Sequence, residues 1–251
     1  MLIKTFLQHP LRVTGRTVWL LWQFLVAALD YLLTTSWRGG PTKPARRAAW
    51  LQRNSVRVLR VCRVTWTVSG PVPRQGLLVT NHLSYVDVLL IAAITPAAFV
   101  AKREVRGWPL LGWFAFVAGT IFVNREKRTQ VTRANAQIEA ALNTGVLLVL
   151  FPEGTSSDGS GVLPFKSALL EPVAHPGRAL SVGHIAYFLE DGHVGQEICY
   201  WADMTLVPHL LNLLGKRNIT AHVSFAEVKE PASDRKELAR QLQAEVVRLK
   251  G

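Results

Sequence analysis

Cysteine and acidic residues are both scarce in this sequence, and the first shortage bears on the cellular compartment. Only two cysteines occur among the 251 residues, Cys62 and Cys199, and no Cys-x-x-Cys pair is present. A disulfide-stapled secreted domain is therefore excluded, and we expect two reduced, buried thiols in a cytosolic domain. The seven histidines form no His-Glu-x-x-His or Cys/His cluster, so we expect no metal site.

The shortage of acidic residues leaves a strongly basic chain. It has 17 Asp and Glu against 29 Lys and Arg, which gives a formal net charge of +12 at pH 7. Such an excess attracts nucleic acid or the anionic face of a bilayer. No helix-turn-helix, zinc-finger or RNA-binding signature is present, so we expect no nucleic acid as partner. The eight tryptophans favour membrane lipids, because indole rings settle at the headgroup level.

Three signatures of common enzyme classes are also missing. There is no Gly-x-Ser-x-Gly elbow, which argues against a serine hydrolase, since Gly159-Ser160-Gly161 is too short for one. Neither Gly-x-Gly-x-x-Gly nor a P-loop occurs, which argues against dinucleotide and ATP binding. We therefore expect no cofactor.

The chain lacks an uninterrupted apolar run long enough to cross a bilayer. The run from Val18 to Leu33 contains Gln23 and Asp30 and falls short of the roughly 20 residues that a spanning helix needs. Basic residues flank it on both sides, so the positive-inside rule gives no orientation. We predict a helix embedded in one leaflet or lying at its surface. A single span and an ordinary core helix are the alternatives.

A second, basic helix is predicted from about Ala45 to Cys62, where arginines alternate with apolar residues. This pattern suits a phospholipid surface, and a solvated arginine face is the alternative. Residues 1–64 are thus predicted to form a membrane-associating helical pair, and residues 65–251 one further domain. The predicted location is the cytoplasmic face of the inner (plasma) membrane, monotopic or single-span.

Beyond residue 65, short apolar runs alternate with helical patterns. This alternation predicts an α/β fold with a mixed, largely buried sheet flanked by helices. Helices are expected at Gln130–Leu142 and at Ser233–Lys250. Strands are expected at Thr65–Ser69, Leu77–Thr80, Ala98–Ala101, Thr120–Val123, Val146–Phe151, Ala179–Ile185, Thr205–Pro208 and Thr220–Val228.

A histidine and an aspartate follow the predicted strand Leu77–Thr80 at a spacing that suits acid–base chemistry. His82 falls on the turn from this strand to a helix that opens near Ser84, and Asp87 lies about one turn into that helix. A carboxylate on one ring nitrogen fixes the tautomer and leaves the other nitrogen free as a base. Polar residues also follow the predicted strands before Asn124 and Pro152, and ligands bind at this edge of open α/β sheets.

Together these blocks resemble the glycerolipid acyltransferases typified by 1-acylglycerol-3-phosphate acyltransferase. The resemblance extends over about residues 76 to 170. Its most specific part is the Phe-Pro-Glu-Gly-Thr block, which Phe151 to Thr155 match in full. The Asn-His-x-x-x-x-Asp motif is matched by Asn81, His82 and Asp87. The Lys-x-Glu block, with its following proline and glycine, is matched by Lys102, Glu104, Pro109 and Gly112. The Gly-x-x-Phe-x-x-Arg block is matched by Gly119, Phe122 and Arg125.

The resemblance implies an O-acyltransferase of phospholipid biosynthesis whose acyl donor is acyl-CoA or an acyl carrier protein thioester. His82 would act as general base on the hydroxyl of a lysolipid acceptor, and Asp87 would orient it. Backbone amides near Gly154 would hold the oxyanion. Lys102 and Arg125 would bind an anionic headgroup, and Glu153 would order the site by pairing with a basic group or by capping backbone donors. Asn81 and Thr155 complete the predicted substrate-binding residues.

Two departures leave the acceptor open. Ser156 stands where phosphatidate-forming members usually carry an arginine, and the Gly-Thr-Ser-Ser-Asp-Gly form resembles lyso-ornithine lipid acyltransferases. The fourth family motif is reduced to residues 179–186 and lacks its central proline. We expect 1-acyl-glycerol-3-phosphate as the first acceptor and lyso-ornithine lipid as the alternative. The non-enzymatic alternative is a basic membrane-binding module on an inactive fold.

Overall fold

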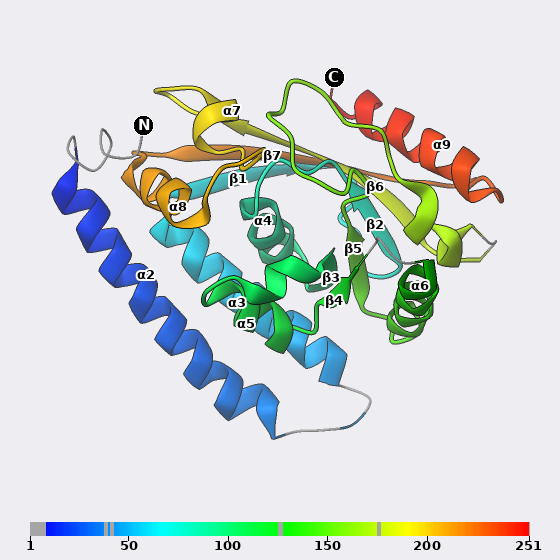
Figure 1. Cartoon of the computed structure of the whole chain (residues 1–251), viewed down its shortest axis with the longest axis horizontal. Helices are drawn as coiled ribbons and strands as arrows, with labels where there is room; N and C mark the ends of the chain where they lie inside the picture. The colour runs from blue at the N-terminus through cyan, green and yellow to red at the C-terminus, as the bar shows by residue number, and fades with distance from the viewer. Residues whose placement is uncertain (1–8, 38–39, 41–42, 125–127, 175–176, 251) are drawn as a thin grey trace.

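A seven-stranded sheet with helices on both faces forms the centre of the molecule (Figure 1). The computed structural model describes residues 9–37, 40, 43–124, 128–174 and 177–250. The strand order is β1-β7-β6-β2-β5-β3-β4, and all neighbours are parallel except β6 and β7. The predicted mixed α/β sheet is confirmed. Its strands are β1 (Val64–Ser69), β2 (Leu77–Thr80), β3 (Ala97–Lys102), β4 (Ile121–Val123), β5 (Leu147–Leu150), β6 (Leu180–Phe188) and β7 (Ile219–Glu227).

The helices cover the two faces of this sheet. On one side lie α6 and α9, and on the other lie α2, α3, α4, α5 and α8. The α-helices are α2 (Pro10–Tyr31), α3 (Lys43–Val61), α4 (Val86–Ile94), α5 (Leu111–Val117), α6 (Arg128–Leu142), α7 (Val194–Glu197), α8 (Leu206–Gly215) and α9 (Arg235–Arg248). Shorter turns are the π-helical η1 (Leu32–Ser36) and the 3₁₀-helical η2 (Arg103–Gly107), η3 (Ser167–Leu169) and η4 (Glu171–Val173).

Seven of the eight predicted strands are present, and the one predicted at Thr205–Pro208 is wrong. Thr205 precedes α8, and Leu206 begins it. Pro208 is tolerated there because the first amides of a helix have no intrahelical acceptor. The apolar residues of this segment continue to Leu213 and Leu214, which are fully buried. A helix of ten residues therefore forms where a four-residue window suggested a strand.

The N-terminal helix is longer than the apolar run predicted. Together α2 and η1 span 27 residues and are long and apolar enough to cross a membrane, by length and composition. Pro10 starts α2 eight residues before the run, because proline is well suited to the first helical turn. One face of α2 packs on the rest of the protein through the buried residues Val13, Leu20 and Ala27. Arg16 on α2 also donates a hydrogen bond of 3.0 Å to the carbonyl of Leu214 in α8.

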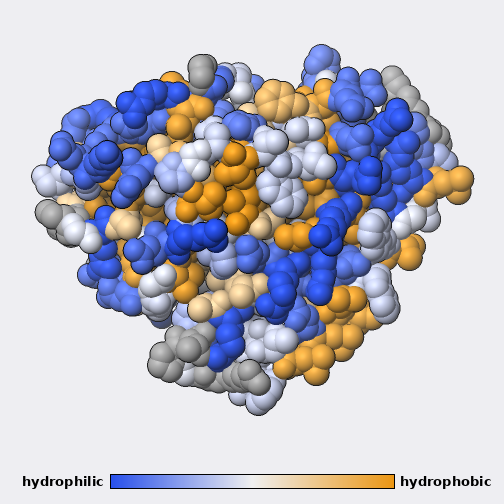
Figure 2. Space-filling model, turned by 180° about the vertical axis from the view of Figure 1, so that it is seen from behind, coloured by the Kyte–Doolittle hydropathy of each residue, from blue (hydrophilic) through white to orange (hydrophobic). Residues whose placement is uncertain are grey.

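The other face of α2 is apolar and exposed. In Figure 2, seen from the side opposite to Figure 1, hydrophobic residues gather along the lower right edge, where α2 lies. The helix therefore has features of two of the predicted arrangements. One side packs on the core, as in a core helix, and the other side is an apolar surface suited to contact with lipid. The exposed apolar residues of α2 are Leu11, Val18, Trp19, Leu21, Trp22, Leu25 and Leu29, and Leu32, Leu33 and Trp37 continue this surface along and just after η1.

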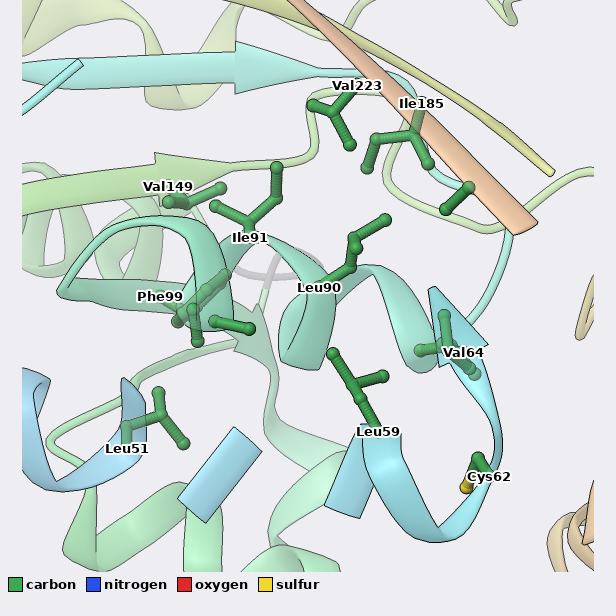
Figure 3. Close-up of a cluster of buried hydrophobic side chains, with 14 of the residues drawn as sticks. Leu51, Leu59, Cys62, Val64, Leu90, Ile91, Phe99, Val149, Ile185 and Val223 are labelled. Atoms are coloured by element: carbon green, nitrogen blue, oxygen red, sulfur yellow. The ribbon is translucent and has the colours of Figure 1, made fainter. Parts of the chain in front are cut away.

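Helix α3 joins this N-terminal segment to the core. Leu59 of α3 points toward α4, whose Leu90 and Ile91 point toward Val149 and Ile185 of the sheet (Figure 3). All five side chains are completely buried. The helical pair therefore shares one hydrophobic core with the sheet, and the domain boundary between residues 64 and 65 stays a prediction. Both cysteines are buried and unpaired, as predicted.

The central strands are buried on both faces. Every residue of β2 and β5 is buried, because α-helices cover both sides. Leu78 and Val149 belong to the cluster under α3 and α4, whereas Leu77 and Leu148 belong to the cluster under α6 and α9. These central strands end side by side at one edge of the sheet, since β2 and β5 are parallel. Because both strands run in the same direction, the residues after Thr80 lie close to the residues after Leu150.

Candidate active site

A pocket of about 520 Å³ lies at this carboxyl edge of the sheet. It collects residues that follow β2, β3, β4 and β5, so the structure brings together blocks that are far apart in the sequence. Six of the predicted family-motif residues line it, namely His82, Lys102, Glu104, Phe151, Gly154 and Thr155. Its walls also include apolar side chains, among them Val88, Phe99, Val100, Val105, Ala115 and Val123. A polar end beside an apolar interior suits a lipid substrate.

His82 and Asp87 are paired as predicted. The Nδ1 atom of His82 lies 2.9 Å from Oδ2 of Asp87, and the imidazole stacks on Phe151 with 4.1 Å between ring centroids. The carboxylate accepts the Nδ1 proton and so leaves Nε2 as the nitrogen available to the pocket. The histidine side chain is 22% exposed, whereas Asp87 is completely buried. The pair thus has the arrangement of a general base with its orienting carboxylate.

Four donors hold the buried carboxylate of Asp87. Besides His82, the backbone amides of Leu83 and Ser84 donate to Oδ2 at 2.6 and 2.9 Å. The phenol of Tyr187 donates to Oδ1 at 2.8 Å. Burial raises the pKa of Tyr187 well above its usual value, so this hydroxyl keeps its proton and remains a donor. A buried carboxylate needs such partners, because an unpaired one would be strongly destabilising.

Sequence patterns did not identify Tyr187. It lies on β6, next to β2 in the sheet but 100 residues away from Asp87 in the chain. It also lies one residue beyond the degraded fourth motif, which ends at Ala186. The signal that sequence reasoning could have used is a tyrosine at a position of β6 that faces the core, since its hydroxyl then requires a partner.

Glu153 caps backbone donors, which is one of the two roles expected for it. Its Oε1 accepts from the amide of His82 at 2.8 Å, and its Oε2 accepts from the amide of Leu163 at 3.1 Å. The residue is only 2% exposed, and burial raises its pKa to about 7 against the pull of these two hydrogen bonds. Glu153 therefore fixes the turn that carries His82 to the Phe-Pro-Glu-Gly-Thr loop.

Asn81 is placed behind the pocket rather than in its wall. Its amide nitrogen donates to the carbonyl of Ile185 at 3.0 Å, and its oxygen accepts from the amide of Ile185 at 2.8 Å. The side chain is buried and joins the end of β2 to β6 in the way that a strand pair would. Its predicted contact with the substrate stays a prediction.

The loop after β5 presents backbone amides to the pocket. Gly154 has a φ of +74°, which glycine adopts without strain, and its amide donates to the carbonyl of Phe151 at 3.2 Å. Within the described ranges, the amides of Thr155 and Ser156 have no hydrogen-bond acceptor. The Ser156 hydroxyl donates to the carbonyl of Tyr200. The amides suited to an oxyanion are therefore those that follow Gly154.

The predicted headgroup cations are only partly placed. Lys102 ends β3, is exposed and lines the pocket together with Glu104. Arg125 lies outside the described residues, and its predicted role stays a prediction. Among the described residues, no group of three or more His, Cys, Asp or Glu side chains is arranged to hold a metal ion.

An aromatic wall that the sequence did not reveal closes another side of the pocket. Tyr85, Trp108 and Tyr200 line it and meet edge to face, with 5.5 to 6.5 Å between centroids. The hydroxyl of Tyr85 lies 3.0 Å from Nδ1 of His209, and Nε2 of His209 lies 3.1 Å from the carbonyl of Cys199. Burial lowers the pKa of His209 to about 4, so the neutral ring donates from Nε2 and accepts from Tyr85.

Comparisons with known proteins agree with this geometry. The Acyltransferase family profile matches residues 63–182. A lyso-ornithine lipid O-acyltransferase of Pseudomonas aeruginosa is 37% identical over 181 residues, which are 71% of this chain and 69% of that protein. A 1-acyl-sn-glycerol-3-phosphate acyltransferase of Neisseria meningitidis is 33% identical over 178 residues, which are 70% and 69% of the two chains.

A solved structure shares the fold over nearly the whole chain. The crystal structure of the 1-acyl-sn-glycerophosphate acyltransferase PlsC from Thermotoga maritima has a TM-score of 0.59 and 20% sequence identity, and covers 95% of this chain and 98% of that one. The match includes the N-terminal segment as well as the sheet. With the family profile and the sequence relatives, it leads to one conclusion: the chain belongs to the acyltransferase family.

Proposed function

We propose that this O-acyltransferase moves a fatty acyl group from acyl-CoA or an acyl carrier protein thioester to the hydroxyl of a lysolipid, with His82 as general base. The observation that carries the proposal is the His82–Asp87 pair at 2.9 Å, in a lipid-suited pocket beside the amides of Thr155 and Ser156. Such a positioned base contributes about 10²–10⁴ in rate.

The reaction needs no acyl-enzyme. Nε2 of His82 removes the proton from the acceptor hydroxyl as its oxygen attacks the thioester carbon. The carbonyl oxygen becomes an oxyanion, which the amides of Thr155 and Ser156 stabilise. When the C–S bond breaks, the new ester forms, and the proton held on His82 passes to the departing thiolate. Asp87 stabilises the imidazolium between these steps.

The first acceptor that we propose is 1-acyl-glycerol-3-phosphate. Lys102 at the pocket rim supports it, because an ammonium group pairs with a phosphate as a point charge. The Neisseria relative carries the name of this activity.

Lyso-ornithine lipid is the second candidate, and a specific observation favours it. Ser156 lines the pocket where phosphatidate-forming members carry a cation, and its hydroxyl is bound to the Tyr200 carbonyl. Glu104 also lines the pocket next to Lys102. Opposite charges side by side suit a headgroup that carries both an amine and a carboxylate.

One experiment separates these functions. Purified protein in vesicles would receive labelled acyl-CoA or acyl carrier protein together with lysophosphatidate, lyso-ornithine lipid or lysophospholipids in parallel. We expect acylation of one of the first two acceptors and its loss in His82→Ala. If no acceptor is acylated, the proposed acyl transfer is wrong, and the alternative of a membrane-binding module on an inactive fold is supported.

We also propose that the protein acts at the cytoplasmic face of the inner membrane as a monotopic protein. The exposed apolar face of α2 supports membrane contact. The opposite face of α2 is attached to α3 and α8, which supports a helix lying along the domain. Trp50 of α3, for example, donates to the carbonyl of Ala27 at 2.9 Å. A spanning helix would have to leave these partners, so a single span is the less favoured arrangement. Protease access from the two sides of oriented vesicles tests both the face and the depth.

A further inference from the structure

Helix α5 and the residue before it carry an exposed apolar stripe that acyl transfer itself does not use. Leu110, Trp113 and Phe116 are 50%, 45% and 49% exposed, and none of them lines the pocket. Gly112 and Val117 of the same helix are buried. A Cβ on Gly112 would lie 2.3 Å from the Arg106 carbonyl oxygen, so α5 packs tightly on the preceding turn at this position. Large apolar side chains gathered at consecutive turns of a surface helix indicate a contact with an apolar partner.

The stripe continues the exposed face of α2. Phe114 packs on Phe24 of α2 with 4.9 Å between ring centroids, and Trp113 meets Tyr31 edge to face at 6.3 Å. At about 100° per residue, Leu21 and Leu25 follow Phe24 around α2 toward its exposed side. The two helices thus present neighbouring apolar surfaces, and what covers one is positioned to cover the other.

Helix α5 is also a wall of the pocket. Trp108 just before it, Ala115 within it and Thr120 just after it all line the cavity. The helix therefore has one side toward the reacting groups and one side toward the outside. Val105 and Phe99 line the same pocket and make this part of it apolar, which suits an acyl chain.

Basic residues accompany the stripe and identify its partner. Lys102, Arg103 and Arg106 are exposed next to α5, with Glu104 as the acidic residue among them. The guanidinium of Arg106 lies 4.8 Å from the centroid of the Phe116 ring. An apolar stripe bordered by cations fits the headgroup and upper acyl region of an anionic phospholipid bilayer.

We propose that α5 inserts into an anionic phospholipid bilayer beside α2 and forms the wall past which the lysolipid chain enters the pocket. This inference rests on the proposed acylation of a lysolipid. It assigns to α5 a part in supplying the substrate, in addition to the attachment that α2 provides. Leu110 and Phe116 are then membrane-contact residues and take no part in the chemical step.

The first test places an environment-sensitive fluorophore on Leu110→Cys and Phe116→Cys, since the two native cysteines are buried. Leu25→Cys on α2 is the positive control. Phe188→Cys and Val247→Cys, which are 56% and 49% exposed on other elements, are matched negative controls. With vesicles of phosphatidylglycerol and phosphatidylethanolamine we expect a blue shift at 110, 116 and 25 and none at 188 and 247. A shift at 25 without one at 110 and 116 would overturn the inference, as would no shift at any position.

The second test separates entry from chemistry. In the double variant Leu110→Ser/Phe116→Ser, we expect acylation of a long-chain lysolipid in vesicles to fall about a hundredfold, because each of the two apolar side chains contributes about a factor of ten to partition. Acylation of a short-chain, monomeric lysolipid should stay within about twofold, the change expected for groups outside the site. Equal losses on both substrates would contradict the role in entry. Absence of any acylation by the unaltered protein, with labels at 110 and 116 still shifting, would remove the proposed function and leave the membrane contact of α5 intact.

Discussion

The end of β2 and helix α5 both border the pocket, but the surroundings of Asp87 and the outer side of α5 are built in opposite ways. The carboxylate of Asp87 is completely buried and accepts from four donors. Around α5 large apolar groups are left exposed, and Leu110 has a φ of +58°. The first region can hold a proton acceptor in one position because its hydrogen bonds over-determine it. The second can exchange its surroundings between water and lipid because few polar contacts fix it.

Loss of His82 breaks the first region most severely. In His82→Ala the base disappears while Glu153 still binds the backbone amide of residue 82, so the loop keeps its support. We expect kcat to fall by about 10³, within the range for removal of a positioned base. Steady-state kinetics on the accepted lysolipid measures this fall, and circular dichroism checks the fold. A variant that keeps a tenth of the activity would show that another group takes the proton.

Protonation of Glu153 probes the same region without altering the dyad. Burial raises its pKa from 4.5 to about 7, so the folded chain binds this proton more tightly than the unfolded chain does. Its contribution to stability is therefore complete below about pH 4.5 and is lost as the pH rises through 7. The shift corresponds to about 3 kcal/mol at most.

Urea unfolding at pH 5, 6 and 7 tests this linkage. The difference in unfolding free energy between the natural protein and Glu153→Gln should shrink steadily over this interval. The comparison cancels His184 and His209, whose pKa values burial lowers to about 4 and whose contribution is lost as the pH falls. A difference that grows with pH would show that the carboxyl is ionised in the fold.

Removal of the Tyr187 hydroxyl makes a smaller change. In Tyr187→Phe the Oδ1 atom of Asp87 loses its 2.8 Å donor and stays buried. We expect a loss of about 2 kcal/mol in unfolding free energy, as for other hydrogen bonds to charged groups, and a lower kcat with KM nearly unchanged. Tyr31→Phe on α2, which removes a hydroxyl outside the site, is the matched control. If both variants behave alike, Tyr187 serves packing alone.

Sequence predicted the residues of the site that are close in the chain and missed those that only the fold brings together. The pairing of His82 with Asp87 was predicted because both lie just after a strand or one turn beyond it, where chain neighbours remain spatial neighbours. Glu153 was predicted through the family resemblance of its Phe-Pro-Glu-Gly-Thr block. Tyr187 and the Tyr85–His209 pair were missed, because only the pairing of β6 with β2 and the packing of α8 bring them close. Because Thr205–Pro208 was predicted as a strand, the helix α8 that carries His209 was not predicted. The apolar run of α2 was recognised, but its length was not, because helix formation extends through polar residues such as Arg12 and Arg16 once α8 binds their side chains.

Backbone strain at Leu110 gives the smallest effect and tests the second region directly. This residue precedes α5 with φ +58° and ψ −56°, which disfavours any side chain with a Cβ. Leu110→Gly and Leu110→Ala both delete the exposed side chain, but only glycine removes the strain. We expect the glycine variant to be more stable than the alanine variant by about 1 kcal/mol in urea unfolding. Both should lose affinity for anionic vesicles equally, since affinity depends on the side chain and stability on the backbone. A glycine variant that is less stable than the alanine variant would show that Leu110 adopts another backbone conformation. The backbone before α5 would then be unstrained, and this part of the contrast with the buried, hydrogen-bonded Asp87 would be wrong.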